Sequence, residues 1–130
     1  MKLWNPQVYE RLSALLAALG KRFNAHPNFE AIGLQETAMG LSEESTTPQQ
    51  EDAFFDNLLK LHAQLRTSFP NTVTIQFTNY PVKKLGLLTS RFKMMGTGLG
   101  GPDVFVNDRG LNRPDGVYSY YPKLAGIVPL

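Results

Sequence analysis

One glutamate stands where α/β proteins often keep an acid or a base. Glu36 follows the segment 29–34, which is too short for a stable helix and apolar enough to be a buried strand. Parallel sheets place their active sites at the carboxyl ends of strands, so Glu36 is the best catalytic candidate in the chain. The alternative is a solvated loop carboxylate that is hydrogen-bonded to neighbouring amides.

Asn79 and Tyr80 follow the end of a second expected strand. Residues 72–78 alternate strictly between polar and apolar types and are rich in β-branched side chains, so they are the clearest strand in the chain. One face of this strand is expected to meet polar surroundings. Tyrosine rings can stack on sugars, whereas the alternative for the tail tyrosines is packing over exposed sheet. The tail tyrosines are Tyr118, Tyr120 and Tyr121.

Three helices are expected, and each has a recognisable start. Apolar side chains then recur at steps of three and four, until about residues 24, 69 and 95. The starts are Asn5-Pro6, a capping box from Thr47 to Gln50, and Asn79-Tyr80-Pro81.

A third strand is expected at residues 104–106, after a glycine-rich turn at 96–101. A helix followed by a strand, three times over, predicts parallel pairing, because a helical crossover returns the chain in the same direction. The expected fold class is α/β, with alternating helix–strand units and a small parallel sheet, as in part of a (β/α)8 barrel or a doubly wound sheet. We expect one domain over residues 1–130, with an irregular tail from residue 107.

Residues 22–37, RFNAHPNFEAIGLQET, resemble the passage from helix to fourth strand in bacterial (β/α)8 glycoside hydrolases. This resemblance implies that Glu36 is the general acid/base. It also implies that Gln35 stands where the family typically has an asparagine that contacts the sugar 2-hydroxyl. Gly100-Gly101-Pro102-Asp103 is similar to the strand-six end of such barrels. The substrate-binding residues implied in this way are Gln35, Asn79, Tyr80 and Asp103.

Glycoside cleavage needs two carboxyl groups, about 5 to 9 Å apart. No glutamate follows Asp52, so only aspartates remain downstream, and none matches a nucleophile of the family. These aspartates are Asp56, Asp103, Asp108 and Asp115. We therefore predict a glycoside-hydrolase-like barrel fragment that is not catalytically competent alone. The alternative is a noncatalytic, self-associating α/β module.

Carbohydrate and a second copy of the chain are the expected partners. Three parallel strands leave two sheet edges and an unpaired apolar surface, which predicts a homo-oligomer. The 13 basic and 11 acidic residues are scattered along the chain and form no basic stripe, which argues against nucleic acid. No apolar run is long enough to span a membrane, and the start has no signal-peptide core, so the localisation stays open.

No metal or cofactor is expected. The chain has no cysteine, and His26 and His62 have no partner at metal-ligand spacing. The G-x-G-x-x-G pattern at 96–101 follows a helix instead of a strand, which argues against a dinucleotide site. A phosphate site at the amides of Gly98 to Gly101 is a further alternative.

Overall fold

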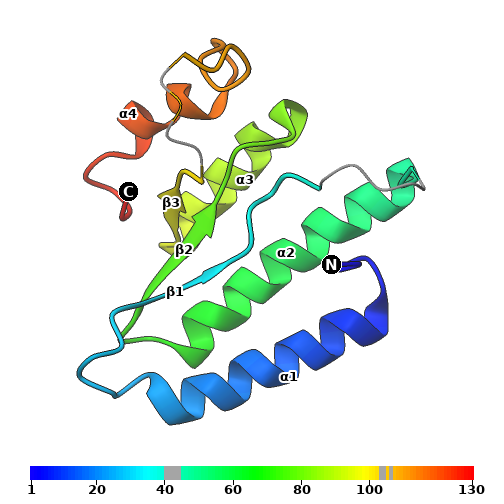
Figure 1. Cartoon of the computed structure of the whole chain (residues 1–130). Helices are drawn as coiled ribbons and strands as arrows, with labels where there is room; N and C mark the ends of the chain where they lie inside the picture. The colour runs from blue at the N-terminus through cyan, green and yellow to red at the C-terminus, as the bar shows by residue number, and fades with distance from the viewer. Residues whose placement is uncertain (40–44, 103–104, 106) are drawn as a thin grey trace. The chain divides into compact units, whose positions relative to one another are not determined.

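A computed structural model describes residues 1–39, 45–102, 105 and 107–130. Its main elements follow the order α1 (Pro6–Phe23), β1 (Ala31–Leu34), α2 (Pro48–Ser68), β2 (Val73–Phe77), α3 (Val82–Met95) and β3 (Gly98–Gly100) (Figure 1). The strands form one parallel sheet in the order β1-β2-β3, which confirms the predicted α/β class. The chain divides into two compact units, one formed by α1 and α2 and the other by the sheet, α3 and the tail.

The predicted capping residues begin the first two helices. The Asn5 side chain accepts hydrogen bonds from the backbone amides of Gln7 and Val8, at 2.9 and 3.4 Å. Thr47 Oγ1 accepts from the Gln50 amide at 3.2 Å, and Gln50 Oε1 accepts from the Thr47 amide at 2.9 Å. Each cap satisfies amides that have no partner within the helix, and both predicted helix starts are confirmed.

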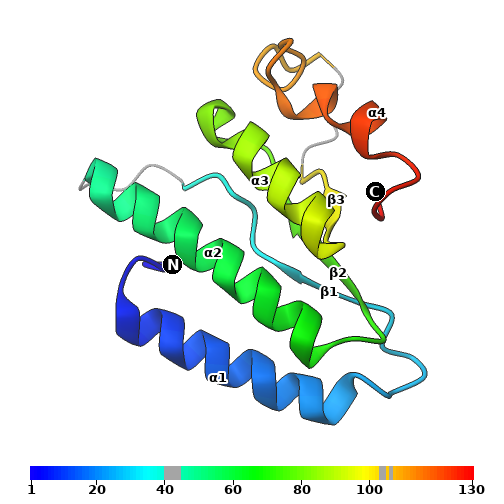
Figure 2. The ribbon, with the colours of Figure 1, turned by 180° about the vertical axis from the view of Figure 1, so that it is seen from behind.

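Helices α1 and α2 lie side by side and run in the same direction (Figures 1 and 2). Near their starts, Asn57 Nδ2 donates to the carbonyl of Leu3 at 3.0 Å. Further along, Gln64 Nε2 donates to the carbonyl of Ser13 at 2.6 Å. A Cβ atom added to Gly20 would lie 2.5 Å from the carbonyl oxygen of Ser68, so glycine is needed for the close approach of the two helices.

The polar side chains of β2 are buried, and its apolar side chains are partly exposed. Thr74 and Gln76 are fully buried, whereas Val73 and Phe77 keep 38% and 42% of their surface exposed. Thr74 Oγ1 lies 3.5 Å from Thr97 Oγ1, so the polar face meets other hydroxyl groups. The strand predicted at 72–78 is confirmed. Its polar face is buried and its apolar face is partly exposed, the reverse of the usual pattern.

Strand β1 is shorter and less buried than predicted. It begins at Ala31, and both Ala31 and Gly33 are exposed, while Ile32 and Leu34 are half-buried. β1 pairs with β2 alone, so within the described sheet it is an edge strand. The expectation of a fully buried strand is therefore wrong, because an edge strand has a neighbour on one side only.

The third strand is β3, within the glycine-rich segment that was expected to be a turn. A Cβ atom on Gly100 would lie 2.6 Å from Cδ1 of Phe77, so the Phe77 ring fills the space of the missing side chain. Residues 104 and 106 of the strand predicted at 104–106 lie outside the described residues, and Phe105 is in no strand and is exposed.

Helix α3 buries the apolar face that its sequence spacing predicts, because Leu85, Leu88 and Phe92 are fully buried. The tail contains two short helices, η1 (Val117–Ser119) and α4 (Tyr121–Leu124), and it buries further apolar side chains. These are Leu111, Val117, Leu124 and Val128. None of the described helices is long and apolar enough to cross a membrane.

Two glycine-to-alanine substitutions test the helix packing. Alanine favours a helix interior over glycine by about 1 kcal/mol. A Cβ atom on Gly86 of α3 would meet only the Tyr120 hydroxyl, at 3.4 Å. We expect Gly86→Ala to raise the free energy of unfolding in urea by about 0.5 to 1 kcal/mol, and Gly20→Ala to lower it by about 1 to 3 kcal/mol through overpacking. Equal stabilisation by both changes would contradict the close contact of α1 with α2.

Candidate functional site

The carboxyl ends of β1 and β2 bring the predicted site residues together. The last paired residues of the two strands are Leu34 and Gln76. Gln35 and Glu36 follow β1, and Asn79 and Tyr80 follow β2, so these residues lie at one end of the sheet, as the sequence predicts. Asp103, the remaining predicted site residue, lies outside the described residues.

The backbone on both sides of Glu36 is held in place by buried polar side chains. Gln76 Nε2 donates to the Gln35 carbonyl at 2.5 Å and to the Phe77 carbonyl at 2.8 Å. On the other side, the Thr37 amide donates to the Phe77 carbonyl at 3.1 Å, and Thr37 Oγ1 accepts from the Asn79 amide at 3.1 Å. Gln76 and Thr37 are fully buried, so Glu36 extends from a fixed main chain.

The side-chain amide of Asn79 has an orientation that its neighbours determine. The backbone amides of Ala38 and Tyr80 approach its Oδ1 atom at 3.2 and 2.8 Å. Backbone amides are obligate donors, so the atom that they contact must be the oxygen. Nδ2 is therefore the atom that faces Glu36, and it donates to Glu36 Oε2 at 3.0 Å.

The Glu36 carboxylate is presented to solvent by this arrangement. The residue is exposed, whereas Asn79 keeps only 4% of its surface exposed. An ionised carboxylate prefers a donor such as Nδ2, and the bond fixes the position of Oε2. Chemically, the group can give or take a proton at the surface of the sheet end.

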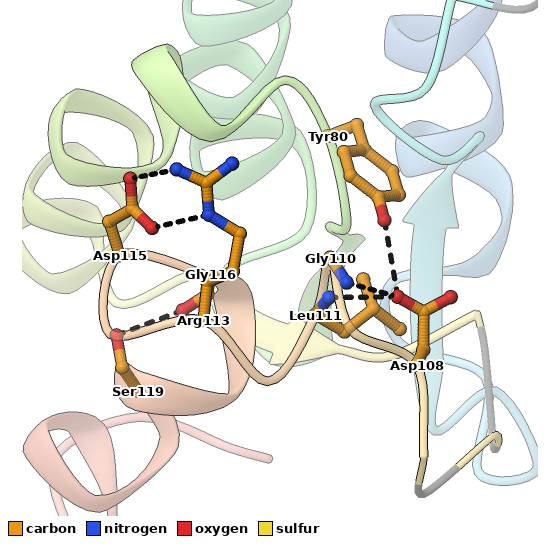
Figure 3. A network of polar contacts seen from close by, with 8 residues as sticks. All are labelled: Tyr80, Asp108, Gly110, Leu111, Arg113, Asp115, Gly116 and Ser119. Atoms are coloured by element: carbon orange, nitrogen blue, oxygen red, sulfur yellow. Dashed lines mark hydrogen bonds and ion pairs between the residues drawn. The ribbon is translucent and has the colours of Figure 1, made fainter.

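Tyr80 links the same strand end to a turn at residues 108–112, which we call the Asp108 turn. Figure 3 shows its phenol pointing toward Asp108, with the oxygen 3.4 Å from Oδ1. That Oδ1 atom also accepts from the amides of Gly110 and Leu111, at 2.7 and 2.9 Å. Tyr80 is thus tied by its amide to Asn79 and by its ring to the Asp108 turn.

The other described aspartates have different roles. Asp115 forms an exposed ion pair with Arg113, with 3.0 Å between Nε and Oδ1 (Figure 3). Asp56 lies on α2, in the other unit. Oδ1 of Asp108 is occupied by the turn that it holds. Asp108 is linked to Glu36 indirectly, through hydrogen bonds of Tyr80 and Asn79.

The tail tyrosines are half-buried and contact one another and α3. The rings of Tyr118 and Tyr121 have centroids 5.9 Å apart. Burial, followed by the proximity of Tyr118, raises the pKa of Tyr121 above its ordinary value. The Tyr120 hydroxyl reaches Gly86, and the ammonium group of Lys123 lies 4.8 Å from the centre of the Tyr120 ring. These contacts favour a packing role for the tail tyrosines over a sugar groove.

The described residues contain no group of three or more histidine, cysteine or acidic side chains that could hold a metal ion. The glycine-rich segment follows α3 and forms β3, whose Leu99 amide donates to the Pro129 carbonyl of the tail at 2.9 Å. An amide that is already used in this way is not directed at a phosphate. This contact counts against the phosphate alternative.

Sequence reasoning did not assign Thr37, Gln76 or Asp108 to the site. For Gln76 a signal was present, because a long polar side chain at an inward position of a strand needs a partner when it is buried. Thr37 and Asp108 gave no comparable signal, since a threonine after a strand and an aspartate two residues before a glycine are ordinary loop residues.

No protein-family model matches this chain, and neither a curated protein nor a solved structure is significantly similar to it.

Replacing Asn79 by aspartate tests the amide orientation through the pH dependence of stability. The new carboxylate would lie beside Glu36, and two adjacent carboxylates cannot both ionise without repulsion, so the pKa of the introduced group is raised in the folded state. The repulsion needs both carboxylates to be ionised, so it is absent in acid and grows as the pH rises through the raised pKa of the introduced group. We expect the free energy of unfolding of Asn79→Asp, relative to wild type, to fall by about 1 to 3 kcal/mol between pH 4.5 and 7.5 in urea titrations.

The matched control is the double variant Asn79→Asp with Glu36→Gln, which removes the like charge. Its stability should follow the pH dependence of Glu36→Gln alone. If Asn79→Asp shows no loss between the two pH values, Nδ2 does not face Glu36.

Proposed function

We propose that the sheet end formed by Glu36 and Asn79 is a carbohydrate site of the glycoside hydrolase type, in which Glu36 is the general acid/base. Glu36 protonates the glycosidic oxygen as the bond from that oxygen to the sugar carbon breaks. The departing alcohol takes the proton, and a second carboxylate or a water molecule bonds to the sugar carbon. Asn79 orients the carboxyl group. Gln35 and Tyr80 contact the sugar in this proposal. Asp103, the remaining predicted contact, lies outside the described residues.

The observation that carries the proposal is the hydrogen bond from Asn79 Nδ2 to Glu36 Oε2, at 3.0 Å. A carboxylate that only stabilises a loop needs no buried partner from a second strand. Glu36 instead has such a partner, whose own amide is fixed by two backbone donors. Exposure of the carboxyl group next to a rigid, buried support is the arrangement that proton transfer to a bound ligand requires.

The strand order supports the barrel component of the proposal. Three parallel strands that neighbour one another in sequence order are typical of a (β/α)8 barrel. A doubly wound sheet reverses its strand order at a switch point, and the described sheet has no such reversal.

One carboxyl group is half of a glycosidase site, so the proposal assigns the acid/base half to this chain. A small carboxylate such as formate can stand in for the second group. With aryl glycosides that have poor leaving groups, we expect negligible turnover alone and measurable turnover with added formate. Glu36→Gln should lower that turnover about 10²- to 10⁴-fold, because protonation of the leaving oxygen is lost.

Glu30→Gln is the matched control, because Glu30 is exposed and directly precedes β1, whereas Glu36 follows it. Its turnover should equal that of wild type. Formate-dependent turnover that is unchanged in Glu36→Gln would reject Glu36 as the acid/base.

A second candidate function is self-association through one face of the sheet. The register places Ala31, Gly33, Val73, Ile75, Phe77, Gly98 and Gly100 on this face, which we call the apolar face. It carries no charged side chain, so two copies can approach without repulsion between like charges. Phe77 forms a ridge between glycines of both neighbouring strands, a shape that suits a two-fold contact between identical faces.

Light scattering over a wide concentration range tests this second function. We expect a dimer mass for wild type and a monomer mass for Phe77→Lys or Val73→Lys, because a buried lysine without a partner opposes association. Met94→Lys is the control, since Met94 is 75% exposed on α3 and belongs to no strand. A monomer mass for wild type at every concentration would reject self-association.

A further inference from the structure

The contact between Tyr80 and the Asp108 turn joins two segments that are far apart in sequence. Asp108 Oδ1 accepts from the amides of Gly110 and Leu111 within its own turn. The carbonyl of Asp108 accepts from the Asn112 amide at 3.0 Å and from Asn112 Nδ2 at 2.8 Å. The turn is therefore closed by local bonds, and the Tyr80 phenol connects it to the end of β2 (Figure 3).

The Tyr80 phenol is held by steric contact as well as by its hydrogen bond. The 3.4 Å between the phenol oxygen and Oδ1 is longer than the ~2.7 Å of a strong O–H···O bond. A Cβ atom on Gly110 would lie 2.1 Å from the same phenol oxygen and 3.1 Å from Cζ. The end of the ring thus rests on the backbone of Gly110, where only glycine leaves room for it.

The backbone at Gly110 does not need glycine for its conformation. The glycines with positive φ among the described residues are Gly96 and Gly126, so Gly110 lies outside the left-handed region. Glycine is needed at position 110 because the phenol of Tyr80 occupies the space that a side chain would fill.

We infer that Asp108 is a positioning residue which, together with Gly110, holds the Tyr80 ring at the sheet end as a contact for a pyranose ring. Tyr80 is half-buried, so part of its ring is available to a ligand. Its amide is bonded to Asn79, the residue that orients Glu36. An aromatic ring fixed at both ends beside the acid/base offers an apolar surface without a large loss of side-chain entropy on binding. The ligand role of Tyr80 rests on the proposed function, whereas its positioning does not.

Fluorine NMR tests the positioning of the Tyr80 ring separately from its role as a ligand contact. The chain has 5 tyrosines, and 3-fluorotyrosine can replace them all, with Tyr80→Phe identifying the resonance of Tyr80. We expect Asp108→Ala and Gly110→Ala to move this resonance toward the solvent-exposed position. Asp108→Asn should leave it near the wild-type position, because its amide oxygen can accept the same bonds. Asp115→Ala is the control, since it removes the ion pair with Arg113 in the same segment.

The same resonance reports binding of methyl hexopyranosides. We expect three single variants each to weaken the affinity for methyl hexopyranosides about 5- to 10-fold: Asp108→Ala, Gly110→Ala and Tyr80→Phe. Binding to the first two is followed on the Tyr80 resonance, and binding to Tyr80→Phe is followed on backbone amide resonances. The double variant of Tyr80→Phe and Asp108→Ala should bind no more weakly than either single variant, because Asp108 acts through the Tyr80 hydroxyl.

The results of these experiments distinguish the positioning of Tyr80 from its role in sugar binding. A Tyr80 resonance that stays in place in both Asp108→Ala and Gly110→Ala overturns the positioning role, whatever the sugar does. A resonance that moves while wild type binds no hexopyranoside overturns the proposed function and the ligand role of Tyr80. Additive losses in the double variant overturn the action of Asp108 through Tyr80.

Discussion

Parallel pairing of β1 with β2 is the constraint on which the candidate site depends. It places the carboxyl ends of both strands at one end of the sheet, where Thr37 and Gln76 extend the contact between the strands by side-chain bonds. Only then can Asn79 direct its Nδ2 group at Glu36. This contact between the strands also accounts for the burial of the polar face of β2, because Gln76 reaches the Gln35 carbonyl from inside the unit.

Local signals in the sequence predicted the helices and the clearest strand well. The caps at Asn5 and Thr47 act through atoms within three residues, so neighbours in sequence contain the whole interaction. The β-branched alternation of residues 72–78 is equally local. The position of Glu36 and Asn79 after strands could therefore be predicted, whereas their hydrogen bond across 43 residues could not.

The errors arose where tertiary contacts outweigh local preference. Glycines at 98 and 100 indicated a turn, yet they form β3 because the Phe77 ring occupies the space above Gly100. The apolar composition of 29–34 indicated burial, but β1 has a neighbour on one side only in the described sheet. Asp108 resembled an ordinary loop aspartate, and the partner that gives it a further role, Tyr80, is 28 residues away.

The proposed function requires that a sugar binds at the sheet end beside Glu36. Binding can be followed in the ¹⁵N-labelled protein by titration with methyl hexopyranosides, with amide resonances observed along the chain. We expect saturable shifts of the Asn79 side-chain amide and of the backbone amides of Glu36 and Tyr80, with the Glu30 amide unchanged. Shifts confined to Val73 and Phe77, or no saturable shift with any hexopyranoside, would contradict it.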